Sequence, residues 1–397
     1  MNSAQRARIT YFLNSTTRYL LLMAAWIALP AWIAPTSWTV VQTQSVEQIT
    51  AQVAETAVAN LHGSEAAPVF ELDPSWPKPL PNNWALGTVW GVSVDMNDHI
   101  WVVHQTAGER YMKPITDAGK EPAPAVLEFD QDGNLLQAWG VPGQGGWTQG
   151  EGRPFPAQTI SVDWEGNVWV SEETRGHAVV KFTGDGKFLL QIGEVDQTNG
   201  SADTTLLGGP GGLDFDPEAN EVYIADGYIN RRIIVFDADT GAYKRHWGRY
   251  GLRPDDDFET GDQLMWPPSP FLIDRPAPLT ATAPRYAHGV NVSDDGLIYV
   301  ADRSHSVVFV HEKDGTYVRE VALPGPVNSV TFSSDREQRY LYAGGMNATA
   351  RIYILRRNDL QMLGSFKSDG QHYMDTDSAG NLFTCGLRMP QRWVLKQ

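Results

Sequence analysis

The sequence contains almost no cysteine and is poor in positive charge. Cys385 is the only thiol among 397 residues, so no disulfide can form within the chain, and there is no Cys-x-x-Cys-His motif for covalent haem. The chain has 31 Lys and Arg against 47 Asp and Glu, which gives a formal net charge of −16. Because such a surface repels nucleic acid and anionic headgroups, no nucleic-acid partner is expected.

Motifs for nucleotides and for hydrolytic serines are also missing. There is no Gly-x-Ser-x-Gly, no phosphate loop and no Gly-x-Gly-x-x-Gly after a predicted strand. The sequence therefore gives no support to a serine nucleophile or to a nucleotide cofactor.

One pattern recurs six times: an apolar strand, a short acidic or glycine turn, and a second strand rich in aromatics. The clearest copies are residues 159–172 and 289–302, and the others begin at Gly91, Gly212, Ser329 and Tyr373. Repeated strands of period two joined by tight turns are typical of a β-propeller in which each copy is one blade. The sequence therefore predicts an all-β fold, a six-bladed β-propeller over residues 67–397.

The ends of the chain are predicted to close this ring. Third strands are expected at 178–182, 232–236, 307–310, 351–355 and 392–395. The last copy ends with the chain after its third strand, so its fourth strand must come from elsewhere. The segment 69–72, just before a proline-rich stretch, is predicted to supply it and to remove the free sheet edge.

The N-terminal residues form a separate unit. Residues 1–18 carry Arg6, Arg8 and Arg18, no acid precedes Glu47, and residues 19–35 are mostly apolar. This pattern predicts a short cytoplasmic basic segment followed by a signal anchor or signal peptide. The lack of an Ala-x-Ala site favours an uncleaved anchor, so we expect an exported, extracytoplasmic or periplasmic protein attached to the cytoplasmic membrane.

Residues 36–66 are predicted to form a helical stalk. Apolar side chains recur at helical spacing between residues 46 and 61. One interpretation is that this stripe pairs with a protein partner near the membrane. The other is a solvated stalk that packs against the propeller.

The residue before each inner strand is expected to face one mouth of the central channel, where propellers bind ligands. In blade order these residues are Trp90, Gln158, Gly211, His288, Asn328 and His372. Gln158, His288 and His372 fall in alternate blades, a threefold arrangement that suits zinc or another divalent metal with open positions. Gln is a poor zinc ligand, and the two histidines have an alternative role as hydrogen-bond donors to channel carbonyls or waters.

A second group of candidates follows the second strands of blades three and four. Asp226 and Asp302 recur in the repeat and are expected to fix turns, whereas Tyr228 and Arg303 do not recur. A tyrosine beside an arginine can have a lowered phenol pKa and act as a general base. The alternative is that Tyr228 is a rim aromatic and Arg303 neutralises nearby aspartates.

Residues 225–233, 286–290 and 299–303 resemble the lyase domain of peptide-amidating enzymes, peptidyl-hydroxyglycine α-amidating lyase, within the NHL-repeat propellers. Weaker similarity extends to gluconolactonases and strictosidine-synthase-like propellers. The resemblance implies that His288 and His372 are two of three zinc ligands. It also implies that Tyr228 removes the hydroxyl proton of a carbinolamide and that Arg303 tunes this tyrosine.

Three positions depart from the pattern of that family. Gln158 replaces the first zinc histidine, Gln105 replaces a carboxylate-binding arginine, and Tyr373 replaces an acid linked to a structural calcium. His104 and Arg110 are candidates to compensate. The leading hypothesis is a lyase-like or hydrolytic metal-dependent enzyme of altered specificity for a small-molecule or peptide-like ligand. The alternative is a non-catalytic propeller that assembles with a membrane or periplasmic partner.

Three loops are long for a propeller, residues 107–125, 144–156 and 249–284, and loops of this length are usually functional or disordered. The two that precede Gln158 and His288 run into inner strands and are expected to cap the same mouth; the alternative is an irregular decorative surface. The acidic run 255–257 is either a cation site or a solvated turn.

Overall fold

The computed structural model describes residues 66–106, 109–140, 148–149, 153–154, 157–172, 176–254, 256, 287–346, 350–386 and 389–396. The predicted membrane segment at 19–35 and the helical stripe at 46–61 lie outside these residues. Within the described part of the chain, no helix is long and apolar enough to cross a membrane.

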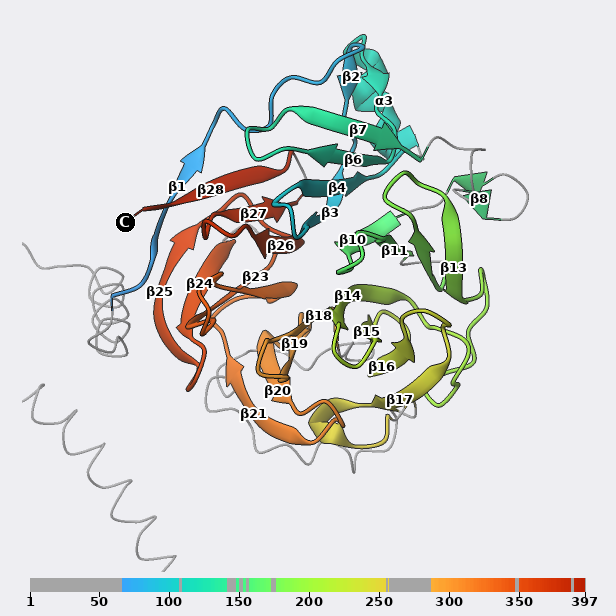
Figure 1. Ribbon diagram of the computed structural model, residues 1–397, viewed down its shortest axis with the longest axis vertical. Coiled ribbons are helices and arrows are strands. Elements are labelled where there is room, and N and C mark those ends of the chain that lie inside the picture. Colours follow the sequence, from blue (N-terminus) through green and yellow to red (C-terminus); the bar gives the residue numbers. More distant parts are fainter. Residues whose placement is uncertain are drawn as a thin grey trace, which may run out of the picture. The chain divides into compact units, whose positions relative to one another are not determined.

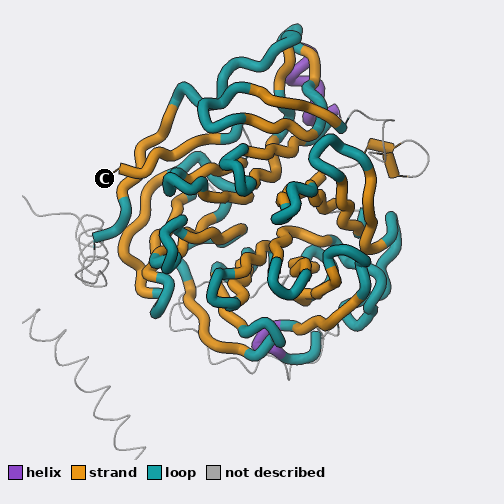
Figure 2. The backbone as a smooth tube through the Cα atoms, in the orientation of Figure 1, coloured by secondary structure: helices purple, strands orange, loops and turns teal. Residues whose placement is uncertain are grey.

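Six four-stranded antiparallel sheets surround a common centre and confirm the six-bladed propeller (Figure 1). The strands of blades one to three are β3 (Val89–Val94), β4 (Ile100–His104), β6 (Val126–Phe129) and β7 (Leu135–Trp139); β10 (Ala157–Val162), β11 (Val168–Glu172), β12 (Ala178–Phe182) and β13 (Phe188–Gly193); and β14 (Pro210–Asp216), β15 (Glu221–Asp226), β16 (Arg232–Asp237) and β17 (Tyr243–Trp247). In each of these three blades the strands follow one another outward from the channel in chain order (Figure 2).

The last three blades repeat this order. Their strands are β18 (Gly289–Val292), β19 (Ile298–Asp302), β20 (Val307–His311) and β21 (Tyr317–Ala322); β22 (Ser329–Phe332), β23 (Tyr340–Gly344), β24 (Arg351–Arg356) and β25 (Gln361–Lys367); and β26 (Tyr373–Thr376), β27 (Leu382–Cys385), β28 (Gln391–Lys396) and β1 (Val69–Asp73).

The ring closes as the sequence predicts. Strand β1 pairs antiparallel with β28, with Val69 opposite Lys396 and Asp73 opposite Arg392. Blade six is thus built from both ends of the propeller, and β1 covers the edge that β28 would otherwise expose.

Part of the insertion 107–125 in blade one adds local structure. It contains helix α3 (Glu109–Asp117) and β5 (Glu121–Pro122), which pairs in parallel with β2 (Trp84–Ala85). The remaining short elements are the hairpin of β8 (Thr148–Gln149) with β9 (Arg153–Pro154) and the 3-10 turn η2 (Arg249–Gly251).

The apolar core lies between neighbouring blades. One cluster joins Trp101 and Val126 of blade one to Ile160 and Val180 of blade two, and a similar cluster joins blades four and five. Because each sheet buries its faces against the sheets beside it, the blades stabilise one another around the whole ring.

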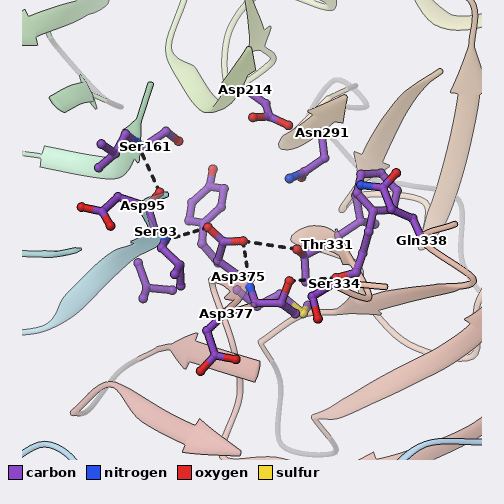
Figure 3. A pocket seen from close by; sticks show the side chains of 18 of the residues that line it. Ser93, Asp95, Ser161, Asp214, Asn291, Thr331, Ser334, Gln338, Asp375 and Asp377 are labelled. Atoms are coloured by element: carbon purple, nitrogen blue, oxygen red, sulfur yellow. Dashed lines mark hydrogen bonds between the residues drawn. The ribbon is translucent and has the colours of Figure 1, made fainter. Parts of the chain in front are cut away.

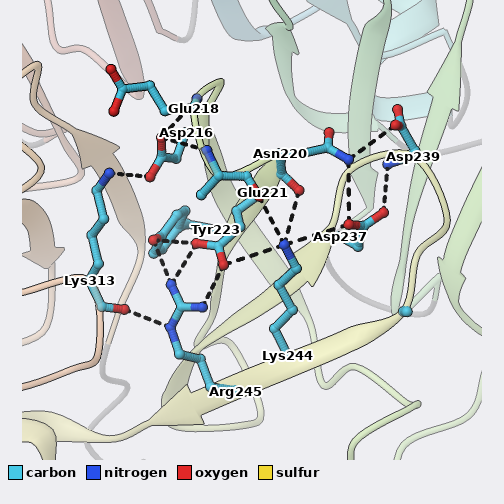
Figure 4. A network of polar contacts seen from close by, with 12 residues as sticks. Asp216, Glu218, Asn220, Glu221, Tyr223, Asp237, Asp239, Lys244, Arg245 and Lys313 are labelled. Atoms are coloured by element: carbon cyan, nitrogen blue, oxygen red, sulfur yellow. Dashed lines mark hydrogen bonds and ion pairs between the residues drawn. The ribbon is translucent and has the colours of Figure 1, made fainter.

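A polar network adds to the contact between blades three and four (Figure 4). The Arg245 guanidinium donates to both carboxylate oxygens of Glu221, at 2.7 and 2.6 Å, and to the hydroxyl of Tyr223. Arg245 Nε also donates to the carbonyl of Lys313 in the next blade, at 2.6 Å. Burial disfavours ionisation of Glu221, but the hydrogen bonds from Arg245 and Tyr223 outweigh it and hold its pKa at about 2.

Candidate active site at one mouth of the channel

The five predicted site residues come from strand ends that meet at one mouth. Gln158 lies in β10 at an irregularity in its pairing with β11, which aims an extra side chain inward. His288 and His372 precede β18 and β26, while Tyr228 and Arg303 follow β15 and β19. Because each first strand begins where the second ends, all five reach the same end of the channel.

Both histidines are held by main-chain carbonyl groups. The distance from His288 Nδ1 to the carbonyl oxygen of Asn328 is 2.7 Å, and that from His372 Nδ1 to the carbonyl oxygen of Trp90 is 2.8 Å. A carbonyl only accepts, so each Nδ1 must carry the proton. Each Nε2 therefore presents a lone pair toward the centre of the mouth.

Gln158 and Tyr228 join the two histidines. The Gln158 amide nitrogen donates to the Tyr228 hydroxyl at 2.6 Å and lies 3.0 Å from His372 Nε2. The Tyr228 hydroxyl lies 2.9 Å from His288 Nε2 and donates to it, because that nitrogen bears no proton. A chain of hydrogen bonds thus runs from the Trp90 carbonyl through His372, Gln158, Tyr228 and His288 to the Asn328 carbonyl.

Electrostatics keep His372 uncharged. Burial lowers its pKa to about 3; the bond to the Trp90 carbonyl opposes this shift, and the nearby charge of Arg303 adds to it. His372 is therefore a neutral acceptor at any physiological pH.

Arg303 covers the tyrosine. Its guanidinium carbon lies 5.1 Å from the centre of the Tyr228 ring, and Nη1 lies 3.5 Å from the hydroxyl. Together with Gly227 and Ala287, the side chains of Tyr228, His288 and Arg303 line a small hollow at the mouth. The cation is therefore placed to stabilise negative charge on the phenol or on a ligand.

Tyr373 forms the floor of the site. Its hydroxyl donates to the carbonyl of His288 at 3.0 Å, and its ring stacks on the His288 imidazole with centroids 5.5 Å apart. A side chain at Gly212 would meet this ring, since a Cβ there would lie 2.9 Å from a Tyr373 carbon. The calcium that the family resemblance implies at this acid position does not fit here, because a phenol fills the place of the carboxylate.

The proposed compensating residues do not all reach the centre. His104 Nδ1 accepts from the Gly87 main-chain nitrogen at 2.9 Å, and Nε2 lies 2.9 Å from the carbonyl of Pro124. Burial lowers its pKa to about 4, so His104 is a neutral structural residue of blade one. Gln105 donates to the carbonyl of Ala157 in blade two, and the side chain of Arg110 lies outside the described part of the chain.

Most of the loops 144–156 and 249–284 lies outside the described residues. Within the acidic run 255–257 only Asp256 is described, and it accepts a hydrogen bond from the main-chain nitrogen of Ser201 at 2.6 Å. This residue therefore fixes a neighbouring turn.

A second cavity, of about 530 Å³, opens beyond Tyr373 toward the other mouth (Figure 3). The third residue of each copy of the repeat lines it: Ser93, Ser161, Asp214, Asn291, Thr331 and Asp375. Burial raises the pKa of Asp214 to about 7 and that of Asp375 to about 6. Sequence reasoning missed this cavity, although the recurrence of a polar residue at one repeat position was a visible signal.

These channel side chains also connect the blades. Asp214 accepts from the main-chain nitrogen of Val292 in blade four at 2.7 Å, and Asp375 accepts from that of Val94 in blade one at 2.8 Å. Ser161 donates to the carbonyl of Leu213 in the blade that follows its own. The polar side chains that line this cavity therefore have a structural role, because they connect neighbouring blades.

Comparisons with known proteins agree with the architecture. No family model matches the chain. NHL repeat-containing protein 3 of Homo sapiens is 26% identical over 290 residues, which is 70% of this chain and 67% of that protein. Peptidyl-glycine alpha-amidating monooxygenase B of Xenopus laevis is 25% identical over 271 residues, 64% of this chain. The chain is a divergent NHL-type propeller.

The NHL-type propeller spans only about a quarter (26%) of the length of that monooxygenase. Among solved structures, virginiamycin B lyase from Staphylococcus aureus shares 13% identity with a TM-score of 0.49, covering 83% of this chain and 100% of that one. A gluconolactonase from Xanthomonas campestris shares 15% identity with a TM-score of 0.40, covering 78% of this chain and 72% of that one. At these values neither structure informs the chemistry of the site.

Proposed function

We propose that the protein is a lyase-like enzyme that removes a proton from a hydroxylated small-molecule or peptide-like substrate at the Tyr228 mouth. The observation that carries this proposal is the contact of the Tyr228 hydroxyl with both His288 Nε2, at 2.9 Å, and the Arg303 guanidinium, at 3.5 Å. A phenol between a neutral imidazole acceptor and a cation is suited to proton abstraction.

The described residues fit a divalent metal as two imidazole ligands and one weak ligand. His288 and His372 would bind through Nε2, since their Nδ1 protons are held by carbonyls, and such a bond commonly orients a metal-bound histidine. Gln158 would bind through its amide oxygen after rotation of the amide. A metal there would polarise the substrate oxygen as a Lewis acid.

In the proposed reaction Tyr228 acts as the phenolate and takes the proton of a hydroxyl on a carbon that also bears nitrogen. The oxygen then forms a carbonyl, the carbon–nitrogen bond breaks, and its electron pair goes to nitrogen. The proton then passes from the Tyr228 phenol to that nitrogen, so the phenolate is regenerated and the atoms balance. Arg303 stabilises the phenolate. A metal on His288 Nε2 would replace the hydrogen bond between that nitrogen and the Tyr228 oxygen.

The first test is turnover of N-acyl-α-hydroxyglycines, followed by the glyoxylate that cleavage releases. We expect activity in the full chain, loss on chelation, and recovery with zinc or another divalent metal. His288→Ala should lower activity and metal content together, whereas His246→Ala, on the outer strand β17, should change neither.

The proposal fails if His288→Ala changes neither metal content nor turnover. It also fails if the folded wild-type chain leaves every acyl variant of this substrate intact. That second result would instead favour a non-catalytic propeller that binds a ligand or a protein partner at the same mouth.

We also propose that this enzyme acts on the outer side of a cytoplasmic membrane. The support is the apolar run at residues 19–33, which follows three arginines and no acid. Extraction of membranes at alkaline pH tests it: an anchored chain stays in the pellet, whereas release into the supernatant would contradict anchoring.

A further inference from the structure

A second cluster of metal-ligand side chains lies in blade one, apart from the Tyr228 mouth. Asp95, His99 and Glu128 each offer a ligand atom, and these atoms lie within 4.8 Å of one another. Asp95 follows β3, His99 precedes β4, and Glu128 lies in β6. The side chains of Asp95 and Glu128 are 9–10% exposed, and that of His99 is 34% exposed.

Blade two shows what the fold places at the equivalent position. Asp163 receives the same hydrogen bonds as Asp95: Trp169 Nε1 donates to it at 2.9 Å, as Trp101 Nε1 does to Asp95 at 3.0 Å. In both blades the second and fourth residues after the aspartate donate their main-chain N–H groups to it. The two turns can therefore be compared residue by residue.

Blade one lacks the lysine that forms an ion pair with the aspartate of blade two. Lys181 pairs in register with Trp169 and places its ammonium 3.3 Å from Asp163. Glu128 pairs in register with Trp101 in the same way. The other blades carry Val235, Val310, Ile354 and Arg392 at this register position. Blade one is thus the one blade with an acid there, and His99 replaces the Asn167 of blade two.

We propose that Asp95, His99 and Glu128 bind a divalent transition metal ion, such as Zn²⁺, in the place that the Lys181 ammonium fills in blade two. An imidazole nitrogen with two carboxylates is a suitable donor set for such an ion. This site is independent of the proposed function of the Tyr228 mouth.

His99 Nδ1 is already close to the distance from each carboxylate that coordination of one ion requires. Tetrahedral coordination with bonds of about 2.05 Å separates ligand atoms by about 3.3 Å. His99 Nδ1 now lies 2.7 Å from Glu128 Oε1 and 3.9 Å from Asp95 Oδ2. Each of these two distances therefore changes by about 0.6 Å when the ion enters, and the ligand oxygens of Asp95 and Glu128 lie within 4.8 Å of each other.

Neighbouring side chains also hold the two carboxylate ligands in position. Gln137 donates to the second carboxylate oxygen of Glu128 at 2.5 Å, and Trp101 holds Asp95. Partners of this kind fix ligand orientation in metal sites. The partly exposed His99 leaves a side open for entry of the ion and for water as a fourth ligand.

Zinc titration calorimetry of tag-free full chain, stripped with a chelator, tests the proposal. His288→Ala/His372→Ala removes the other candidate metal site and should still bind one Zn²⁺ per chain. Adding His99→Asn/Glu128→Lys, which recreates the blade-two arrangement, should weaken that binding at least tenfold. Asp132→Asn, an exposed change in the same blade, should leave it unchanged.

The proposal is overturned if the folded His288→Ala/His372→Ala chain binds no zinc, or if the blade-one changes leave its zinc affinity intact. Should that background fail to fold, wild type is compared directly with His99→Asn/Glu128→Lys. A zinc stoichiometry lower by one per chain then supports the site, and an unchanged stoichiometry overturns it.

Discussion

At the scale of single residues, Gln158 determines how the Tyr228 mouth can bind a metal. Its amide nitrogen contacts both the Tyr228 hydroxyl and His372 Nε2, where the family resemblance implies a third zinc histidine. An amide that donates to these two groups competes with a metal for the His372 lone pair. The site therefore holds its residues in place by hydrogen bonds, and any metal must displace some of them.

Gln158→His should restore a three-imidazole site. We expect at least about tenfold tighter zinc binding, because imidazole is a better zinc ligand than a carboxamide. Calorimetric titration with zinc is done in the His99→Asn/Glu128→Lys background, which removes the proposed blade-one site and leaves only binding at the Tyr228 mouth. An affinity equal to that of the parent with Gln158 would show that the two histidines do not share a metal.

The repeat made most of this site predictable, because it places the residue before each inner strand at one mouth. It could not reveal Tyr373, whose hydroxyl reaches across the channel to the carbonyl of His288. Nor could it fix which Gln158 amide atom faces His372. Both depend on side-chain contacts between residues far apart in the sequence.

At the scale of strands, the pairing register determines which side chains face each other across a blade, and for blade one the sequence does not reveal this register. The third strand of blade one, Val126–Phe129, follows the insertion at 107–125 and is not among the third strands that the repeat predicts. Without that strand, the position of Glu128 opposite Trp101 cannot be read from the sequence. The other five third strands and the closing segment β1 follow directly from the repeat and are confirmed.

Strands β15 and β17 also carry a pH-dependent contact. Glu221 has a pKa of about 2, below its usual value, so its contribution to stability is present above about pH 4.5 and is lost as the pH falls toward 2. Glu221→Gln should lower the free energy of unfolding at pH 7 by about 1–3 kcal/mol, since Arg245 loses its bidentate partner.

Urea unfolding at several pH values measures this effect. The difference between wild type and Glu221→Gln should shrink below pH 4.5, while Glu218→Gln, an exposed change beside the same turn, should have little effect at any pH. A difference independent of pH would contradict the assignment.

At the scale of the whole molecule, Tyr373 lies between the Tyr228 mouth and a polar cavity of about 530 Å³. The carboxyls of Asp214 and Asp375 join blades around that cavity at the expense of partial desolvation. Their raised pKa values mean that the folded state holds their protons more tightly than the unfolded chain does. Their contribution to stability is therefore lost as the pH rises from about 4 to 7.

Asp214→Asn/Asp375→Asn keeps an acceptor oxygen for the main-chain bonds and removes both charges. We expect this variant to be more stable than wild type at pH 8 by about 1–2 kcal/mol, with the gain absent below pH 4. Thermal unfolding across this range checks it. A variant that is less stable than wild type at pH 8 would show that the ionised carboxylates strengthen the ring.

The most direct test of the central claim, that the Tyr228 mouth is an acid–base site, is kcat of Tyr228→Phe on an N-acyl-α-hydroxyglycine that the wild type cleaves. Phenylalanine keeps the ring under Arg303 and removes only the hydroxyl that contacts His288 and Gln158. A positioned acid–base group contributes about 100-fold or more to the rate, so kcat should fall by at least that factor with the fold intact. A folded Tyr228→Phe chain with the kcat of the wild type would contradict the account.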